Sequence, residues 1–214
     1  MSNYIAILFD LDGTLLDSED HILTSFRHAL STVLGMTMPD EMLKDLIGIP
    51  LRHQMQRFDT EHVDELLEVY REYNLQSYKK LLKVFPHTAS TLTTLKEAGY
   101  RLAVVTSKMT QTAILHLDLF GLTGFFEFVQ GSDLTEHHKP EPEPLLTAAA
   151  RMSLGPERCV YVGDSPYDMI AARAAGMLAV GALWGMFTRE RLLDAGAQLE
   201  ATTISELLLV LPEQ

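Results

Sequence analysis

Two aspartates separated by one residue, Asp10 and Asp12, follow a short apolar run and precede Gly13. Alternate residues of an extended chain point the same way, so both carboxyl groups are expected to face one site. Two carboxylates so close together repel each other, which raises the apparent pKa of one of them or requires a cation between them. Taken alone, the pattern is equally typical of a surface turn, because Asp and Gly favour turns.

Two further apolar runs also end in polar residues. One leads into Thr106 and Ser107, and the other leads into Asp164. If the runs are strands of one parallel sheet, their carboxyl ends share the edge at which open α/β sheets bind ligands. A third carboxylate at that edge increases the repulsion, and a hard cation with oxygen ligands would relieve it. Mg²⁺ is the expected ion, because it binds a few carboxylates together with substrate phosphate oxygens.

Two other segments offer groups for a phosphorylated ligand. The hydroxyl and backbone N–H groups of Thr106 and Ser107 are suited to phosphate oxygens, although a plain helix N-cap is the alternative. Lys139 lies in the proline-rich stretch 138–144, where prolines hold the preceding residues extended. A lysine fixed in this way would neutralise the carboxylates and the charge developing on a phosphoryl group. A solvated loop is the alternative for that stretch.

Asp168 has two interpretations that the residues alone leave open. Ser165, Pro166 and Asp168 have the spacing of a capping box with proline at the first helical position. Asp168 therefore either caps a helix or supports the metal site. Asp164 precedes the cap, so capping does not explain it.

Short apolar runs alternate with helical patterns along the chain. This alternation predicts a parallel, Rossmann-like α/β sheet that positions these residues. Residues 16–82 break this rhythm, contain no convincing strand and are predicted as a helical cap over the sheet edge. The expected division is a core of residues 1–15 and 83–214 with the cap inserted between them. The expected strands are 5–9, 102–105, 126–129, 160–162 and 178–182; the core helices are 88–98, 110–119, 145–152 and 166–175; the cap helices are 21–34, 41–47, 52–58 and 61–80.

Composition limits the partners. The chain has 214 residues and a formal net charge of −12, which argues against nucleic acid and anionic membranes as partners. An anionic substrate would then need local cations. The single cysteine, Cys159, excludes an internal disulfide and is expected to be buried. No signal peptide or apolar run of about 18 residues is present, so a cytoplasmic protein is expected.

The four motifs in this order resemble those of the haloacid dehalogenase-like hydrolases over nearly the whole chain. They read Asp-Leu-Asp-Gly-Thr at 10–14, Thr-Ser at 106–107, Lys-Pro at 139–140 and Gly-Asp-Ser-Pro-Tyr-Asp at 163–168. The inserted segment is similar to the small helical cap of the subgroup that contains phosphoglycolate phosphatases.

This resemblance implies a mechanism. Asp10 would attack phosphorus and form an aspartyl-phosphate. Asp12 would protonate the leaving oxygen and then deprotonate the attacking water. The carboxylates of Asp10 and Asp164 and the backbone carbonyl of Asp12 would bind Mg²⁺. Thr106 would bond the transferring phosphoryl group, and Lys139 would stabilise its charge.

The sequence defines the substrate less closely than it defines the reaction. Relatives with dehalogenase or phosphonate chemistry lack an acid at position 12, so Asp12 favours a phosphate ester or anhydride. Residues 139–145 and 184–197 resemble phosphoglycolate phosphatases, whereas residues 70–74 and the overall length also resemble bacterial pyrophosphatases. Arg52 is expected either to pair with a substrate carboxylate or distal phosphate or to be a solvated cap residue.

The predicted function is hydrolysis of a small phosphate monoester, with pyrophosphate as the alternative. A sugar phosphomutase and a phosphorylatable receiver domain are weaker candidates, and a monomer or homodimer is expected. The eight histidines show no convincing metal-ligand spacing. Of these, His87 and His116 are expected on surfaces or at caps.

Overall fold

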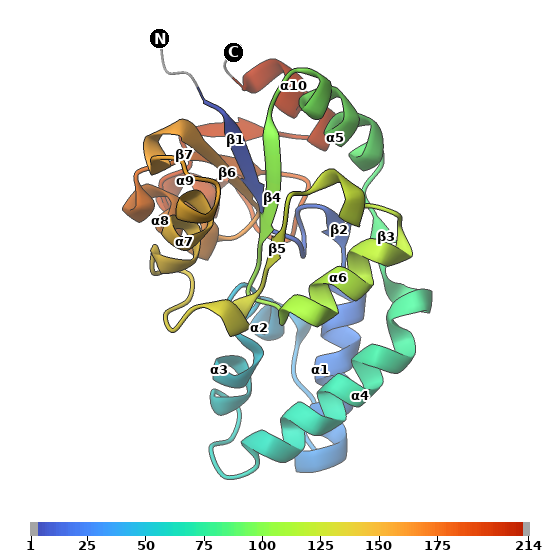
Figure 1. The fold of residues 1–214 in the computed structure, drawn as a ribbon. Coiled ribbons are helices and arrows are strands. Elements are labelled where there is room, and N and C mark those ends of the chain that lie inside the picture. Colours follow the sequence, from blue (N-terminus) through green and yellow to red (C-terminus); the bar gives the residue numbers. More distant parts are fainter. Residues whose placement is uncertain (1–3, 212–214) are drawn as a thin grey trace.

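The computed structural model describes residues 4–211, in which a parallel sheet forms the upper body of the molecule and four helices form the lower one (Figure 1). Within these residues the sheet has six strands in the order β5-β4-β1-β6-β7-β8, with every neighbouring pair parallel. The predicted parallel α/β fold is therefore confirmed. The strands are β1 (Ala6–Phe9), β4 (Arg101–Val105), β5 (Val129–Gln130), β6 (Cys159–Gly163), β7 (Leu178–Ala182) and β8 (Leu199–Ala201).

Side chains on the two faces of the sheet pack into separate hydrophobic cores, because alternate residues of a strand point to opposite faces. Ile7 and Phe9 of β1 pack on one side, whereas Ala6 and Leu8 pack on the other. Both faces are covered, which explains why the central strands are apolar throughout. One face is covered by α5 (Thr88–Glu97), α6 (Thr110–Leu119) and α10 (Leu207–Val210), and the other by α7 (Glu143–Arg151), α8 (Pro166–Ala175) and α9 (Arg189–Asp194).

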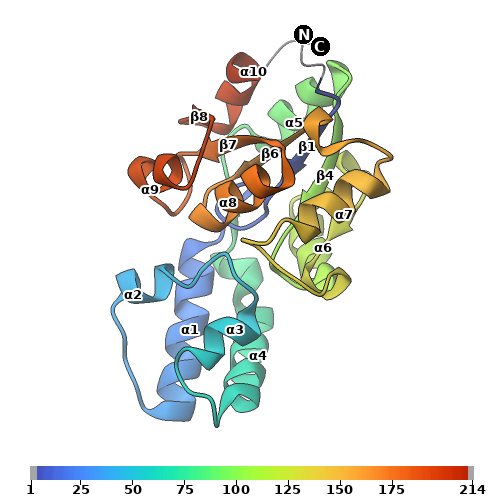
Figure 2. The same cartoon turned by 90° about the vertical axis from the view of Figure 1, so that its left-hand side faces the viewer.

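The four helices that follow β1 and precede α5 form a body of their own below the carboxyl edge of the sheet (Figure 2). A separate apolar core holds them together, with Phe26 and Leu66 fully buried in it. The long helices α1 and α4 pack against each other along this core. The helices are α1 (Glu19–Leu34), α2 (Asp40–Lys44), α3 (Leu51–Gln56) and α4 (Val63–Leu81).

Three strand predictions need correction. Residues 16–82 were expected to contain no strand, but β2 (Leu16–Asp17) pairs antiparallel with β3 (Lys83–Val84) where the chain enters and leaves the helical body. The strand expected at 126–129 is regular only at Val129–Gln130, although Glu127 N already donates to Leu102 O of β4. The edge strand β8 was not predicted, because its three residues include the charged Glu200.

Short 3₁₀ helices complete the chain at Thr123–Phe125, Ser132–Leu134, Pro156–Arg158 and Ile204–Glu206. Cys159 is fully buried in β6, as expected. None of the helices within residues 4–211 is long and apolar enough to cross a membrane.

Candidate active site

Asp10 is the first residue beyond β1, and its N–H donates to Val162 O of the neighbouring strand at 2.9 Å. The chain then turns at Gly13, which has a φ of 78° in the left-handed region that favours glycine. A Cβ atom at Gly13 would lie 2.1 Å from Asp164 Oδ2. Glycine is therefore required both for the turn and for the close approach of Asp164.

Lys139 is the central cation of the site. Its Nζ atom lies 3.0 Å from Asp10 Oδ1 and 2.6 Å from Asp168 Oδ1, and it donates to the Tyr161 hydroxyl at 3.1 Å. That hydroxyl donates in turn to Val105 O at the end of β4 (2.9 Å). Burial opposes the charge on Lys139, but Asp10 and Asp168 outweigh it and raise its pKa well above the ordinary value. The ammonium is thus a fixed charge between two carboxylates.

Asp164 and Asp168 follow β6 and have different surroundings. Asp168 forms the predicted capping box with Ser165, so the capping interpretation is confirmed, but the same carboxylate also pairs with Lys139. Asp164 accepts a hydrogen bond from Met186 N at 2.8 Å and a long one from the Thr14 hydroxyl at 3.4 Å. Within the described residues, no ion pair neutralises Asp164.

The carboxylates of Asp10, Asp164 and Asp168 lie close enough to share an ion, with one oxygen of each within 4.8 Å of the others. Burial, followed by opposing effects of Lys139 and the neighbouring aspartates, raises the pKa of Asp10 to about 7. Burial and the charges of Asp168 and Asp10 raise the pKa of Asp164 well above its ordinary value. Both groups are costly to ionise without a further cation.

The donor set fits a hard cation such as Mg²⁺, because all its ligand atoms are oxygens. Asp168 already uses one oxygen for Lys139 and the other for Ser165. Apart from the Lys139 ion pair at Oδ1, the Asp10 carboxylate makes no ion pair or side-chain hydrogen bond with the described residues. Asp10 and Asp164 are therefore the side chains best placed to bind the ion.

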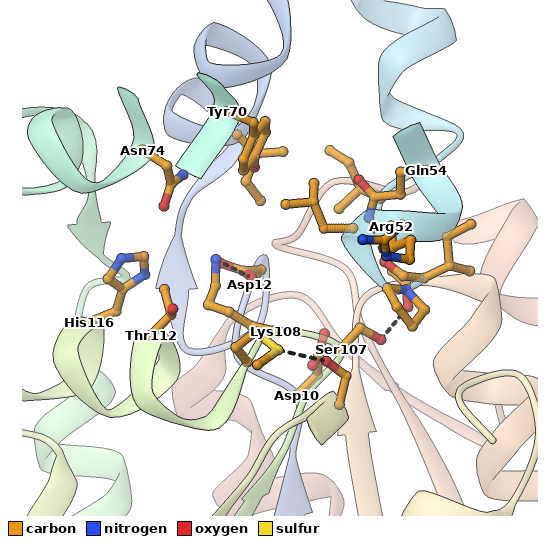
Figure 3. A pocket seen from close by; sticks show the side chains of 18 of the residues that line it. Asp10, Asp12, Arg52, Gln54, Tyr70, Asn74, Ser107, Lys108, Thr112 and His116 are labelled. Carbon is orange, nitrogen blue, oxygen red and sulfur yellow. Dashed lines mark hydrogen bonds and ion pairs between the residues drawn. The ribbon is translucent and has the colours of Figure 1, made fainter. Parts of the chain in front are cut away.

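Asp12 has a cation of its own. Lys108 Nζ lies 3.0 Å from Asp12 Oδ2 (Figure 3). Burial alone would raise the pKa of Asp12, but Lys108 and other neighbours lower it below its ordinary value. The sequence analysis assigns no function to Lys108. Its position directly after Ser107 is the sequence feature that could have indicated one.

The remaining predicted residues lie in three different settings. Thr106 N donates to Gln130 O at 2.9 Å, and its hydroxyl accepts from Lys108 N at 3.2 Å. The hydroxyl of Ser107 donates to Gly48 O of the helical body at 2.6 Å, so it joins the two bodies. The N-cap alternative for Thr106 and Ser107 is wrong, because α6 begins at Thr110. Arg52 pairs with Asp64 at 2.6 Å and its side chain is 54% exposed.

A cavity of about 420 Å³ lies between the carboxyl edge of the sheet and helices α3 and α4 (Figure 3). Asp10, Asp12, Asp164, Ser107 and Arg52 line it. Lys139 and Thr106 are buried and do not belong to its lining. The arrangement places the carboxylates of Asp10, Asp12 and Asp164 on the sheet side of a partly open cavity with room for a small substrate.

The expectation that His116 lies on a surface or at a cap is wrong, because its side chain is 1% exposed and lines the same cavity. Its ring stacks on Tyr78 at 5.4 Å between centroids. Burial and the charge of Lys108 lower the pKa of His116 to about 3, so the ring is neutral at physiological pH. Packing of α6 against α4 buries this histidine, and no local sequence pattern reports such packing.

Comparison with known proteins agrees with this geometry. Residues 7–182 match the family model of haloacid dehalogenase-like hydrolases. The chain is 37% identical over 209 residues to the pyrophosphatase PpaX of Anoxybacillus flavithermus, covering 98% of this chain and 97% of the relative.

Two solved structures share the fold over almost their whole length. One, described as a predicted phosphoglycolate phosphatase from Haemophilus somnus, has a TM-score of 0.90 and 26% identity, with 98% of each chain covered. A haloacid dehalogenase-like family hydrolase from Streptococcus pneumoniae has a TM-score of 0.86 and 28% identity, with 98% of this chain and 99% of that chain covered. The chain therefore belongs to the haloacid dehalogenase-like hydrolases.

Proposed function

We propose that this protein is a Mg²⁺-dependent phosphatase that hydrolyses a small phosphate compound through an aspartyl-phosphate on Asp10. One observation carries the proposal. Asp10 and Asp12 face one cavity while Lys139 holds a buried positive charge 3.0 Å from Asp10 Oδ1. A nucleophile, an acid/base group and a fixed cation are the parts that phosphoryl transfer needs.

In the first half of the reaction, an Asp10 oxygen attacks phosphorus and the bond to the leaving oxygen breaks. In the resting site Lys108 holds Asp12 as a carboxylate, so Asp12 first takes the proton of the protonated substrate phosphate and then gives it to the leaving oxygen. Lys139 and the Thr106 hydroxyl are proposed to stabilise the charge on the phosphoryl oxygens.

In the second half, water attacks the aspartyl-phosphate. Asp12, now a carboxylate, takes a proton from this water, and the bond between phosphorus and Asp10 breaks to release phosphate. The Lys108 ion pair is suited to this stage, because it favours the carboxylate form of Asp12.

Asp10 and Asp164, with the backbone carbonyl of Asp12, are proposed to hold Mg²⁺. A bound Mg²⁺ offsets negative charge on the phosphoryl group. We also propose that residues 16–82 act as the cap that closes over the substrate and excludes water.

A small phosphate monoester resembling phosphoglycolate is the first substrate candidate, supported by the structural neighbour described as a predicted phosphoglycolate phosphatase. Pyrophosphate is the second candidate, and the 37% identical pyrophosphatase relative favours it. Release of phosphate from both compounds, measured side by side with Mg²⁺, separates the two.

Replacement of the nucleophile tests the proposal. Asp10→Asn is expected to lower kcat for p-nitrophenyl phosphate at least about 1,000-fold, because the amide cannot form the covalent intermediate. Asp20→Asn is the matched control, since that aspartate is 72% exposed and lies outside the cavity lining. An Asp10→Asn protein with activity near that of the control would refute the assignment.

A further inference from the structure

The side of the cavity between α4 and α6 contains polar groups to which the proposed reaction steps assign no contact with the substrate. Lys108 is the first of them. Its side chain is 12% exposed, and its ammonium pairs with Asp12 alone among the described residues. The lysine backbone is fixed, because Lys108 N donates to the Thr106 hydroxyl and Ser132 N donates to Lys108 O. The Lys108 ammonium is carried on a fixed backbone, and it has N–H donors left for a ligand.

His116 is the second group. Both ring nitrogens lack a hydrogen-bond partner in the described part of the chain, although the side chain is 1% exposed. Buried polar atoms are normally hydrogen-bonded, so two unpaired nitrogens at a cavity wall point to a ligand or an ordered water. A neutral imidazole offers one donor and one acceptor.

Lys108 and His116 lie on the same side of the cavity, with Asp12 beside the lysine (Figure 3). In the proposed mechanism Asp12 protonates the leaving oxygen. The Lys108 ammonium, which pairs with Asp12, therefore lies next to the leaving group. An anion brought beside Asp12 would be repelled unless a cation offset the carboxylate. Lys108 supplies that cation in a chain whose net charge is −12.

We propose that Lys108 and His116 form a subsite for an anionic leaving group, either the second phosphoryl group of pyrophosphate or the carboxylate of a phosphoglycolate-type ester. The inference rests on the proposed function and deepens it, because it assigns substrate selection to α6 and the loop before it. Arg52 is less suited to the role. It is already paired with Asp64, and it lies on the opposite, α3 side of the cavity (Figure 3).

The test compares ratios of kcat/KM. Pyrophosphate and phosphoglycolate provide anionic leaving groups, and phenyl phosphate provides an uncharged one as the reference. In Lys108→Met the ratio of an anionic substrate to phenyl phosphate is expected to fall roughly 10- to 100-fold, as for loss of a charged hydrogen bond. Lys108→Arg should restore most of the ratio, since it keeps the charge. His116→Phe should lower the ratio less, because a neutral donor is lost.

Lys80→Met is the matched control, since Lys80 is exposed on α4 outside the cavity lining. A selective fall for pyrophosphate or for phosphoglycolate supports the subsite and identifies the anion. An unchanged ratio for both anions overturns it, as does a fall caused by Arg52→Met but not by Lys108→Met. A wild-type protein that cleaves phenyl phosphate but neither anionic substrate also overturns the subsite, while the proposed phosphatase function stands.

Discussion

At the scale of single residues, the site has fewer cationic side chains than carboxylates. Lys139 serves both Asp10 and Asp168, and Lys108 serves Asp12. Asp164 is left without an ion pair in the described part of the chain. Because a buried, unpaired carboxylate is costly, this imbalance leaves one charge to be supplied from outside the chain.

The two proposed roles of Asp12 give a prediction about the order of events. Asp12→Asn should still allow slow phosphorylation of Asp10 by a substrate with a good leaving group, such as p-nitrophenyl phosphate. Release of phosphate should be slowed further, by about 100-fold or more, because the base that activates water is missing. A burst of p-nitrophenol followed by a slow phase, with phosphate found on the protein by mass spectrometry, is the expected result.

The control for this experiment is Asp10→Asn, which should show neither the burst nor the covalent phosphate. If both half-reactions of Asp12→Asn slowed equally and no phosphorylated protein accumulated, Asp12 would not be the base for water.

At the scale of elements, the sequence could predict the strand ends because each central strand is a continuous apolar run that stops at a polar residue. Asp10, Thr106 and Asp164 all follow such runs, and the parallel order of β4, β1 and β6 brings them to one edge. The two-residue strands β2 and β3 have no periodicity to detect. Their pairing is decided by where the helical body meets the sheet.

Contacts between residues far apart in the sequence account for the other features that the sequence did not predict. His116 acquires its place when α6 packs against α1 and α4. Lys108 meets Asp12, and Ser107 meets Gly48, only in the folded chain. No short pattern encodes such contacts. The sequence could therefore predict which side chains meet at the sheet edge, but not the wall of the cavity that α4 and α6 form.

The loop between α2 and α3 links the helical body to the sheet edge. Gly48 O accepts from Ser107, and Asp45 O accepts from the Tyr167 hydroxyl at 3.2 Å. Asp45 also pairs with Arg191 at 2.5 Å. These contacts come from three separate loops and helices of the sheet-containing body, so we propose that this loop couples closure of the helices to the site.

Gly48 gives the prediction at this scale. Its φ is 111°, and an added Cβ would lie 2.8 Å from the Tyr167 ring. Gly48→Ala should therefore displace the loop and lower kcat/KM for p-nitrophenyl phosphate about 10-fold or more, with a loss of about 1–3 kcal/mol in unfolding free energy.

Gly35→Ala is the matched control, because Gly35 also has a positive φ of 61° but would place its Cβ in open space. It should lose about 1 kcal/mol of stability and keep its activity. Equal kinetic constants for the two variants, measured with urea unfolding curves alongside, would show that contact of this loop with the sheet edge has no part in turnover.

At the scale of the whole molecule, the site and the stability of the fold are linked through Asp10. Its pKa of about 7 in the folded chain lies above the ordinary value of 3.8. The folded chain therefore keeps a proton that the unfolded chain has already lost, and the free energy of unfolding falls as pH rises from about 4 to 7. The contribution is fully present below pH 3.8 and absent above pH 7. It amounts to a few kcal/mol, since one pKa unit corresponds to about 1.4 kcal/mol.

Asp10→Asn separates this contribution from all other titrating groups, because an amide resembles the protonated acid and does not titrate. In EDTA, wild type and Asp10→Asn should have similar unfolding free energies at pH 4, whereas the variant should be more stable by a few kcal/mol at pH 8. Adding Mg²⁺ at pH 8 should stabilise the wild type more than the variant, since the ion binds the ionised carboxylates that the folded chain otherwise tolerates poorly. Urea unfolding followed by circular dichroism measures both proteins under all three conditions. A difference between the two proteins that stays constant from pH 4 to pH 8 would mean that Asp10 ionises as easily in the folded chain as in the unfolded one, and the charge imbalance inferred for the site would then be wrong.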